Sequence, residues 1–501
     1  MLSKMFSTKN ISLKKIDVFL IIFLIIQPIF DLKIFYNSIS TLIRVVIMFG
    51  FFSYYFFTNK NNKKYYLLIY PLFIFVYFIF HHINAIKFNS LVPGNFNYSI
   101  IKEGLYFVKM LCPFLLIYCL YKSNLSKNML LNIIKLLVCV IGITIIISNI
   151  FVFSYGSYSD QVIKANFLSW FTDNNYSYQD LASKGLFEYA NQIGAILLMF
   201  LPFSLYLFIE NRKAVNLFVL LINIFCMFLL GTKVSVLGIF IVFTYTFFMY
   251  IFHTKLISKQ KLKIVSLINC TTLLLLYLLI LFNNPIFIRI NEDKVIATSS
   301  PSVSTIESNV NDIEDSNLKE TVSAQSDVLA TNDLEKKYTE LQIKKEFITQ
   351  CYPYEYDSEF WIKIFDESLS NRVNYRFIEQ SMIKRVVEIN DNRYDKYLGI
   401  TNTRLQNIFN IERDFVVQYY ALGILGLILV FLPYLLLLIW YLYKTIKTNF
   451  KNLTVENLLA FISILMTFGV SFFSGNLLNS LSFTIYFAIL FVLLLPTDKA
   501  H

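Results

Sequence analysis

The chain has 501 residues, of which 56% are hydrophobic and only 15% are charged. A water-soluble domain needs far less apolar material for its core, so this composition excludes an ordinary soluble protein and predicts a polytopic membrane protein. The formal net charge of +11 comes mainly from lysines beside apolar runs. Such lysines suit an anionic lipid surface and give no indication of nucleic-acid binding.

Apolar runs of the length that crosses a bilayer, about 20 residues, recur along most of the sequence. They predict an all-α membrane protein with about twelve transmembrane helices. In chain order the predicted helices cover residues 17–36, 42–57, 65–81, 104–121, 136–154, 188–209, 214–231, 234–252, 264–284, 415–441, 457–473 and 480–496. The predicted domains are therefore the first nine helices in 1–284, a large polar loop over 285–413, and the last three helices in 414–501.

The distribution of Lys and Arg predicts the orientation, because basic residues in short loops remain on the cytoplasmic side. The short segments 60–64, 255–263 and 444–451 are rich in lysine, whereas the alternate short loops contain few basic residues. We therefore expect a protein of the cytoplasmic membrane with both termini in the cytoplasm. The loop 285–413 is then extracytoplasmic.

The large loop falls into two parts by composition. Residues 291–345 are rich in Ser, Thr, Asn and acidic residues, which predicts a flexible insertion. From 346 to 413 aromatic residues return and apolar residues recur at helical spacings, which predicts amphipathic helices over the membrane surface. Cys351 is the single cysteine of the loop, so no disulfide can form within it.

Several strong chemical motifs are absent from the sequence. It contains neither a G-x-x-x-x-G-K-[ST] nor a G-x-G-x-x-G motif, so nothing indicates a nucleotide-driven pump or a dinucleotide enzyme. It also lacks H-E-x-x-H and paired C-x-x-C motifs. We therefore predict neither a metal site nor another cofactor.

Polar residues gather at the predicted outer ends of the helices, where a charge costs less than at the bilayer centre but is still unusual. These residues are Asp31, Arg44, Glu103, Lys109, Glu188, Asn191, Lys233, Glu412, Arg413 and Asp414. Each alone has an ordinary explanation, because cations snorkel to lipid phosphates and acids complement helix N-termini. Taken together, Arg44, Lys109 and Lys233 predict a cradle for a lipid pyrophosphate.

Short stretches spread along the chain form a recognisable set. They are QPIFDL (27–32), LIRVVIM (42–48), KEGLYFVKMLCPFLLIY (102–118), GLFEYANQIGAILLMFLP (185–202), GTKVSVLG (231–238), SLSNRVNYR (368–376), LGITNTR (398–404) and IERDFVVQYYALGILG (411–426). The set resembles the O-antigen polymerase and ligase family of bacterial membrane proteins. The resemblance covers most of the chain outside 291–345.

This resemblance implies an integral membrane glycosyltransferase at the outer face of the cytoplasmic membrane. Members of the family take glycan from an undecaprenyl-pyrophosphate carrier and either join repeat units or ligate the chain to another acceptor. Arg372 and Arg376 then correspond to functional basic residues of the large loop, and Glu412 and Asp414 to its acidic exit. The implied partners are the lipid-linked oligosaccharide and membrane lipid, together with a chain-length regulator and a flippase of the same pathway.

Physical chemistry suggests a role for each group. Cations stabilise the charge that develops on the leaving pyrophosphate, and a carboxylate accepts the proton of the acceptor hydroxyl. We therefore predict Glu412, Asp414 and Arg372 as catalytic residues. The predicted substrate-binding residues are Arg44, Lys109, Lys233, Arg376, Asn191 and Asp31.

Three functions remain open at this point. Ligases of the family typically place a functional histidine in the large loop, and residues 285–413 contain none, which favours a polymerase. His81 and His82, at the end of a predicted helix, could substitute for that histidine, so ligation to another acceptor is the first alternative. The second is a transporter or flippase of lipid-linked oligosaccharide, which twelve helices would suit, although no inverted repeat is visible.

Overall fold

The computed structural model describes residues 13–36, 38–92, 94–172, 176–291, 338–408, 413–451, 453–475 and 477–495. It confirms the all-α polytopic fold, because nine described helices are long and apolar enough to cross a membrane and two more apolar helices are shorter. The described strands, β1 (Tyr155–Gly156) and β2 (Ser183–Gly185), form one antiparallel pair. Most of the predicted insertion at 291–345 lies outside the described residues.

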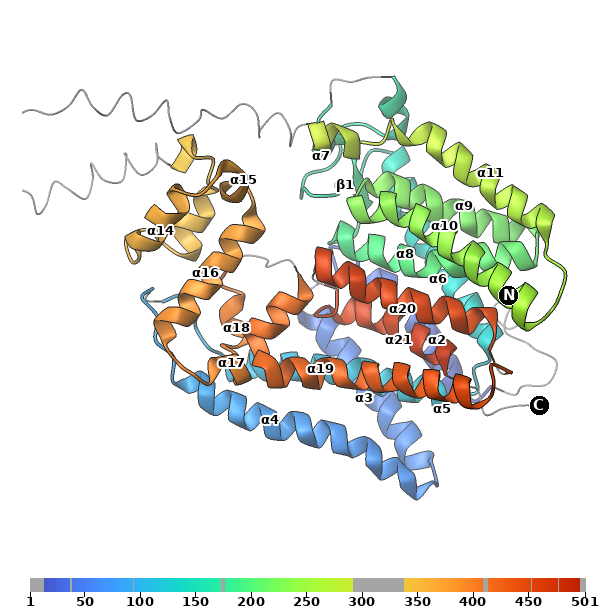
Figure 1. Ribbon diagram of the computed structural model, residues 1–501, viewed down its shortest axis with the longest axis horizontal. Coiled ribbons are helices and arrows are strands. Elements are labelled where there is room, and N and C mark those ends of the chain that lie inside the picture. Colours follow the sequence, from blue (N-terminus) through green and yellow to red (C-terminus); the bar gives the residue numbers. More distant parts are fainter. Residues whose placement is uncertain are drawn as a thin grey trace, which may run out of the picture.

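Every predicted membrane-crossing run coincides with a helix of the bundle in Figure 1. These helices are α2 (Lys15–Phe30), α3 (Ser38–Thr58), α4 (Ile69–Ile86), α5 (Ile100–Lys122), α6 (Lys127–Ile150), α8 (Ala190–Glu210), α9 (Ala214–Leu230), α10 (Lys233–Phe252), α11 (Ile264–Leu281), α19 (Asp414–Lys447), α20 (Val455–Ser474) and α21 (Leu481–Leu494). The connections contain η1 (Asn62–Leu68), η2 (Phe167–Phe171), α7 (Tyr178–Leu181) and η3 (His253–Ile257).

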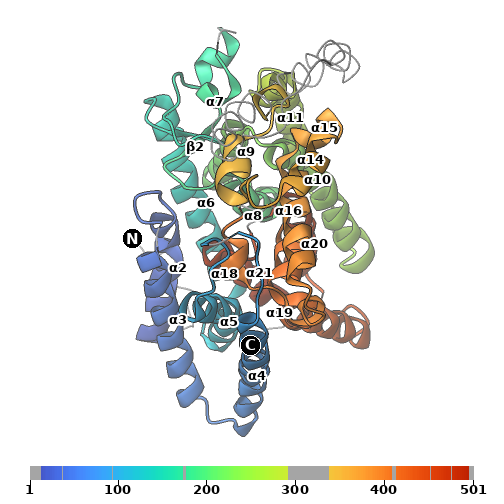
Figure 2. The same cartoon turned by 90° about the vertical axis from the view of Figure 1, so that its left-hand side faces the viewer.

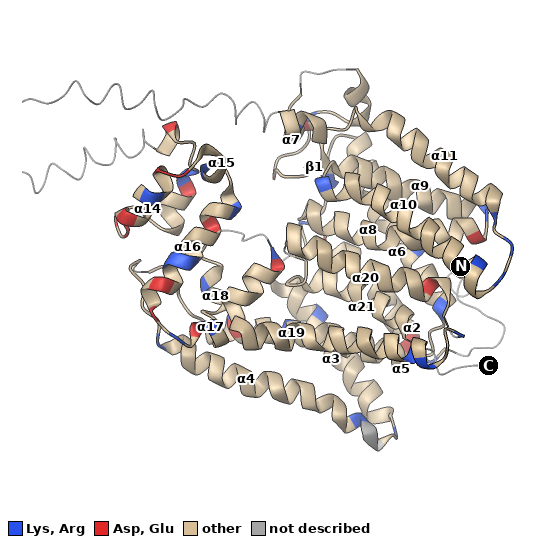
Figure 3. Ribbon diagram, viewed as in Figure 1, with Lys and Arg blue, Asp and Glu red and all other residues tan. Residues whose placement is uncertain are grey.

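A smaller lobe stands at one end of the bundle, which we call the loop end (Figures 1 and 2). At the other end, called the opposite end, α5 and α19 finish at Lys122 and Lys447. The lobe contains η6 (Phe347–Cys351), α14 (Ser358–Phe365), α15 (Leu369–Arg372), α16 (Tyr375–Asn390), α17 (Asp395–Leu398) and α18 (Asn402–Leu405). Acidic and basic residues lie mainly on the lobe and near the two ends of the bundle (Figure 3).

Helices α8 and α21 lie at the centre of the bundle. In α8, 89% of the residues in its 18-residue apolar stretch are buried inside the protein. Every residue of α21 is buried as well. A helix that is covered on all sides needs no polar face toward water, which explains why most residues of α21 are apolar.

Several helix boundaries differ from the prediction, most of all the start of α6, which lies at Lys127 where the prediction has 136. The prediction places the first helix over 17–36, whereas α2 ends at Phe30. The chain turns there because the Lys33 N–H donates to the Leu186 carbonyl at 2.8 Å, which ties this connection to the start of α8. The helix predicted at 415–441 continues to Lys447 and has Lys444 and Lys447 in its last turn. A helix can extend to such lysines at the membrane surface, because their long side chains reach the lipid head groups.

Helix α19 is interrupted near the loop end at Gly423, whose φ of 63° and ψ of −175° are not helical. The break frees carbonyl groups of the preceding turn, and an unpaired carbonyl in a membrane costs several kcal/mol. The segment before α18 supplies the missing donors. The N–H groups of Ile400 and Thr401 donate to the carbonyls of Tyr420 and Ala421 at 2.9 and 3.0 Å.

The close crossing of these two segments requires glycine on both of them. An added Cβ on Gly399 would lie 2.1 Å from the Ala421 oxygen, and one on Gly423 would lie 2.3 Å from the Tyr397 carbonyl carbon. Both glycines have a positive φ, which residues with side chains rarely adopt. The lobe is therefore joined to α19 by main chain packed directly against main chain.

Helices α4 and α5 hold the same segment of the lobe. His81 lies with Nδ1 2.6 Å from the Leu398 carbonyl and Nε2 3.1 Å from a Glu103 carboxylate oxygen. The Glu103 carboxylate also accepts the N–H groups of Asn402 and Thr403 at 3.0 and 2.9 Å. His81 and Glu103 are both fully buried. Their contacts therefore fix the position of α17 and α18 against the bundle.

Replacing Gly423 by alanine is expected to destabilise the protein by about 1–3 kcal/mol, because the new residue must adopt an unfavourable φ. Thermal unfolding of the detergent-purified protein measures the change. Gly50→Ala on α3 is the matched control, since no atom lies within 4 Å of its added Cβ. An unchanged melting temperature for Gly423→Ala would contradict the main-chain crossing.

Candidate functional site

A pocket of about 250 Å³, which we call the polar pocket, opens at the loop end. Its walls come from the turn after β1, from the passage between β2 and α8, and from the end of α20. The lining residues are Ser157, Tyr158, Ser159, Asp160, Lys184, Glu188, Tyr189, Ala190, Asn191, Gln192, Ser474 and Gly475. Most of them are polar, in contrast to the apolar helices around them.

The strand pair β1–β2 carries two walls of the polar pocket. Serine hydroxyls and one glycine fix its position. The Ser157 hydroxyl donates to the Leu230 carbonyl at 2.7 Å. The hydroxyls of Ser154 and Ser183 lie 2.6 Å apart across the two strands. Gly185 has a φ of 70°, and an added Cβ would lie 3.1 Å from the backbone of α6. The strand pair therefore packs directly against the bundle.

Two lysines and an aspartate meet at the rim of the polar pocket. The Asp160 Oδ1 atom lies 2.7 Å from Lys33 Nζ and 3.8 Å from Lys184 Nζ. The Lys184 side chain is only 6% exposed, whereas that of Asp160 is 78% exposed. Burial lowers the pKa of Lys184, whereas the hydrogen bond with Asp160 raises the pKa of Lys33. The same hydrogen bond lowers the pKa of Asp160.

The residues around the start of α8 supply three more polar side chains. Glu188 is half-buried within electrostatic reach of both lysines, and its carboxylate has no hydrogen-bond partner in the described chain. The Asn191 amide oxygen accepts the Tyr158 hydroxyl at 2.9 Å. Gln192 is 4% exposed, and its Nε2 has no partner among the described residues. The pocket thus offers cations, an amide donor and a carboxylate, which can hold an anion and accept a proton.

Asp414, a predicted catalytic acid, is tied to the backbone near this pocket. It is fully buried, and one of its carboxylate oxygens accepts the N–H groups of Leu477 and Leu478, both at 3.0 Å. These amides follow Gly475 of the pocket wall closely in the chain. Asp414 therefore positions the segment that borders the polar pocket. The other predicted acid, Glu412, lies outside the described residues.

Arg44 and Asp31, both predicted to bind substrate, form a buried ion pair. Arg44 Nη2 lies 2.5 Å from Asp31 Oδ1, and the two side chains are 1% and 3% exposed. The Tyr486 hydroxyl donates to the other Asp31 oxygen at 2.9 Å, and the Arg44 guanidinium also contacts the Ser482 hydroxyl. The ion pair thus connects α2 and α3 to the central helix α21.

The other predicted basic residues are spread over the structure. Lys233 is the exposed first residue of α10, and Lys109 is half-buried on α5. Arg372 is buried at the end of α15, where it donates to a main-chain carbonyl of α14 at 3.2 Å, and Arg376 is half-buried in α16. Among the predicted residues that the structure describes, Asn191 lines the polar pocket.

Sequence reasoning missed most of the pocket's charged and amide groups. Asp160, Lys184 and Gln192 were not predicted as site residues, and Lys33 fell within the helix predicted over 17–36, whereas the structure places it after the end of α2. The signal that could have revealed them is KGLFEYANQ (184–192), where polar residues recur just before an otherwise apolar helix.

Replacing Asp31 by leucine is expected to destabilise the protein by about 3–5 kcal/mol, because the Arg44 guanidinium would remain buried without its counter-charge. The double variant Asp31→Leu/Arg44→Met should recover much of this loss, since neither ion then has to be desolvated. Melting temperatures of the purified variants provide the measurement. Single variants that keep wild-type stability but lose activity would identify the pair as a substrate site.

Comparison with protein families matches residues 13–498 to the family described as O-antigen ligase like membrane protein. No curated protein and no solved structure gives a match. The matched region contains every helix of the bundle and the lobe. Membership supports glycan processing at a membrane by a glycosyltransferase-type activity, with a lipid-linked glycan as substrate. The chain belongs to the O-antigen ligase-like family of membrane proteins.

Proposed function

We propose that the protein is a polymerase that joins oligosaccharide repeat units carried on undecaprenyl pyrophosphate. The observation that carries this proposal is the polar pocket, where the Glu188 carboxylate without a hydrogen-bond partner lies near two ammonium groups. The family supplies the lipid-linked glycan as substrate, and the cations suit its pyrophosphate. The orientation expected from the lysines places the loop end, and hence the reaction, at the outer face of the cytoplasmic membrane.

Chain growth of this kind is a glycosyl transfer. A hydroxyl oxygen of the acceptor sugar forms a bond to the anomeric carbon of the donor glycan. The bond between that carbon and the pyrophosphate oxygen breaks, and its electron pair leaves with the pyrophosphate. The hydroxyl proton passes to a base. Catalysis therefore requires a proton acceptor on one side of the anomeric carbon and positive charge on the other.

The pocket residues can fill these roles. Glu188 accepts the hydroxyl proton, while Lys184 and Lys33 stabilise the charge on the pyrophosphate. The unpaired Gln192 amide donates to a substrate oxygen, which satisfies a buried group that otherwise has no partner. Asn191 extends the same wall.

Further cations can approach this pocket from neighbouring elements. The starts of α8 and α10 lie close together, because an added Cβ on Gly194 would lie 2.7 Å from the Ser235 hydroxyl. Lys233 at the start of α10 is therefore a proposed pyrophosphate contact. Arg372 and Arg376 are proposed glycan contacts, since the lobe and the strand pair β1–β2 lie at the same end of the molecule (Figure 1).

The histidines favour polymerisation over ligation. The large loop 285–413 contains no histidine in its sequence, although family ligases typically place a functional one there. His81 is fully buried between a main-chain carbonyl and Glu103. His82 hydrogen-bonds to the Tyr98 hydroxyl at 2.7 Å. Neither histidine lines the polar pocket.

Glu188→Gln should lower chain elongation at least about 100-fold, because an amide cannot accept the acceptor's proton. Purified protein in vesicles, supplied with a lipid-linked repeat unit, allows product length to be followed on gels. Glu340→Gln, which changes an exposed carboxylate of the lobe, is the matched control. Full elongation by a folded Glu188→Gln variant would rule out this base.

The pH dependence of elongation tests Lys184. Its ammonium is present below its pKa and lost as the pH rises through it, and burial has lowered that pKa from the usual 10.5. Elongation should therefore fail at a lower alkaline pH than an ordinary lysine would allow. Lys184→Arg should extend activity to higher pH, because arginine remains charged. Lys164→Arg, at a lysine whose side chain is 65% exposed, should leave the profile unchanged. Identical alkaline limits in all three proteins would contradict the role.

Glycan analysis of a deletion strain separates the polymerase from its alternatives. Loss of a polymerase leaves single repeat units on the carrier or the acceptor and removes the ladder of longer chains. Accumulation of long lipid-linked polymer would instead identify a ligase. Repeat units trapped on the inner leaflet would identify a transporter.

A further inference from the structure

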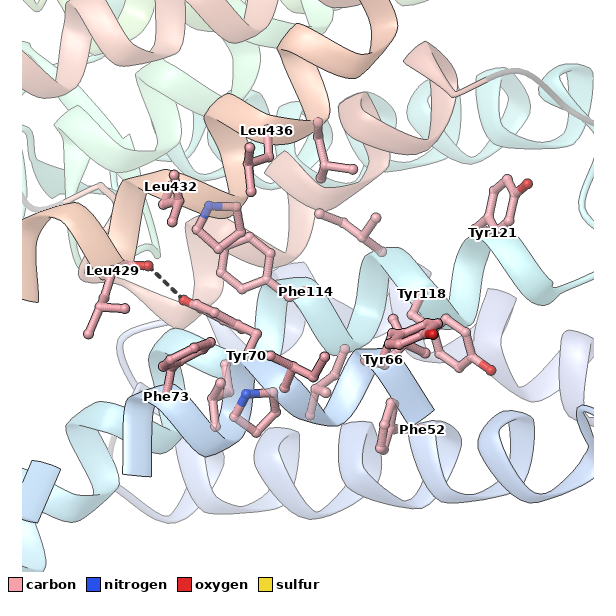
Figure 4. A pocket seen from close by; sticks show the side chains of 18 of the residues that line it. Phe52, Tyr66, Tyr70, Phe73, Phe114, Tyr118, Tyr121, Leu429, Leu432 and Leu436 are labelled. Carbon is pink, nitrogen blue, oxygen red and sulfur yellow. Dashed lines mark hydrogen bonds between the residues drawn. The ribbon is translucent and has the colours of Figure 1, made fainter. Parts of the chain in front are cut away.

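An apolar groove of about 710 Å³, which we call the wedge groove, lies between α4 and the rest of the bundle (Figure 4). Its walls come from α3, η1, α4, α5 and α19, together with Leu495, which directly follows α21. The lining consists of Leu, Ile, Phe, Tyr, Trp and Pro residues, and contains no charged side chain among the described residues. Its volume falls within the range of about 300–1,000 Å³ that is typical of ligand sites.

The wedge groove lies where α4 separates from α19. Near the loop end, the Tyr77 hydroxyl contacts the carbonyls of Leu422 and Leu398, the second at 3.1 Å. Toward the opposite end α4 and α19 diverge (Figure 1). In the span that contains α4, only 17% of the residues in its 18-residue apolar stretch are buried. This is the smallest share among the nine described helices that are long enough to cross a membrane. The described helices therefore leave an open space between α4 and α19.

One hydrogen bond crosses the wedge groove and is determined by the sequence. Pro433 in α19 has no N–H, so the Leu429 carbonyl lacks its helical donor. The Tyr70 hydroxyl of α4 donates to that carbonyl at 3.0 Å (Figure 4). This contact satisfies the backbone and sets the spacing of the two walls. The groove is thus a defined feature of the fold.

Two cations border the wedge groove toward the opposite end. The Lys122 ammonium lies 5.4 Å from the Tyr121 ring centroid, and the Lys444 ammonium lies 4.6 Å from that of Trp440. Tyr121 and Trp440 line the groove on α5 and α19 respectively. Aromatic residues and lysines in this arrangement are typical of the membrane interface. An occupant with an apolar body and an anionic head matches both parts of the groove.

We propose that the wedge groove binds one anionic phospholipid from the leaflet at the opposite end of the bundle. Its acyl chains lie along the apolar walls, which water cannot solvate favourably. Its phosphate lies between Lys122 and Lys444, which attract an anionic head group. The polar pocket is at the other end of the molecule, so this inference does not depend on the proposed glycan transfer.

Native mass spectrometry of the full-length protein tests the proposal with two probes, phosphatidylglycerol and phosphatidylcholine of identical acyl chains. The wild type should retain one phosphatidylglycerol at least about tenfold more tightly than phosphatidylcholine. Lys122→Gln/Lys444→Gln should remove this preference. Lys255→Gln/Lys261→Gln, which changes two exposed lysines at the same end, is the matched control and should keep it.

A groove-filling variant tests the apolar part separately. Leu436→Trp narrows the wedge groove and should reduce retention of both phospholipids by about tenfold. Leu425→Trp changes an exposed leucine of α19 outside the groove lining and should have no effect. Equal retention of the two phospholipids by the wild type would overturn the proposal. So would a preference that survives the Lys122→Gln/Lys444→Gln change, or tighter retention of a polyprenyl phosphate.

Discussion

A helix that stops and restarts inside a membrane must find new partners for its backbone, and this constraint organises the loop end. At Gly423 the freed carbonyls of α19 receive the amides of Ile400 and Thr401. The same segment is held by His81 and Glu103 from α4 and α5. Movement of the lobe would leave backbone groups unpaired in hydrocarbon, which is costly. The lobe therefore keeps a fixed position against the bundle.

Two kinds of buried charge can be contrasted in this protein. The pairs Arg44–Asp31 and His81–Glu103 are almost completely buried and bonded to one another, so they connect helices. In the polar pocket, Glu188 and Lys184 have incomplete sets of partners. Incompletely paired ionisable groups in a pocket are more common at functional sites than in structural networks. This contrast supports the polar pocket as the place where substrate completes the missing contacts.

Hydropathy alone located every long helix, because each apolar run has to match the thickness of the bilayer. The sequence also showed the unusual charged and polar residues at the helix ends, but it did not show which residues pair with them. The pairing of Asp31 with Arg44 depends on how α2, α3 and α21 pack, and local sequence does not encode that. Lys184 lies in β2, a strand of three residues that are all buried, which is too short for a periodic pattern to reveal its burial.

The interruption at Gly423 was equally hidden in the sequence, because a glycine within an uninterrupted apolar run is compatible with a continuous helix. Only the segment that crosses it, around Gly399, reveals the break. The site was therefore predictable as a region, through the GLFEYANQ stretch, but not as a set of paired and unpaired groups.

Hydrogen bonds between main-chain groups depend little on the side chains that flank them. The joint between the lobe and α19 is built largely from such bonds, with glycine required at 399 and 423. The exposed surface of the lobe can therefore accept many substitutions while the joint stays intact. Evolution can in this way change the lobe's surface without rebuilding the membrane bundle that supports it.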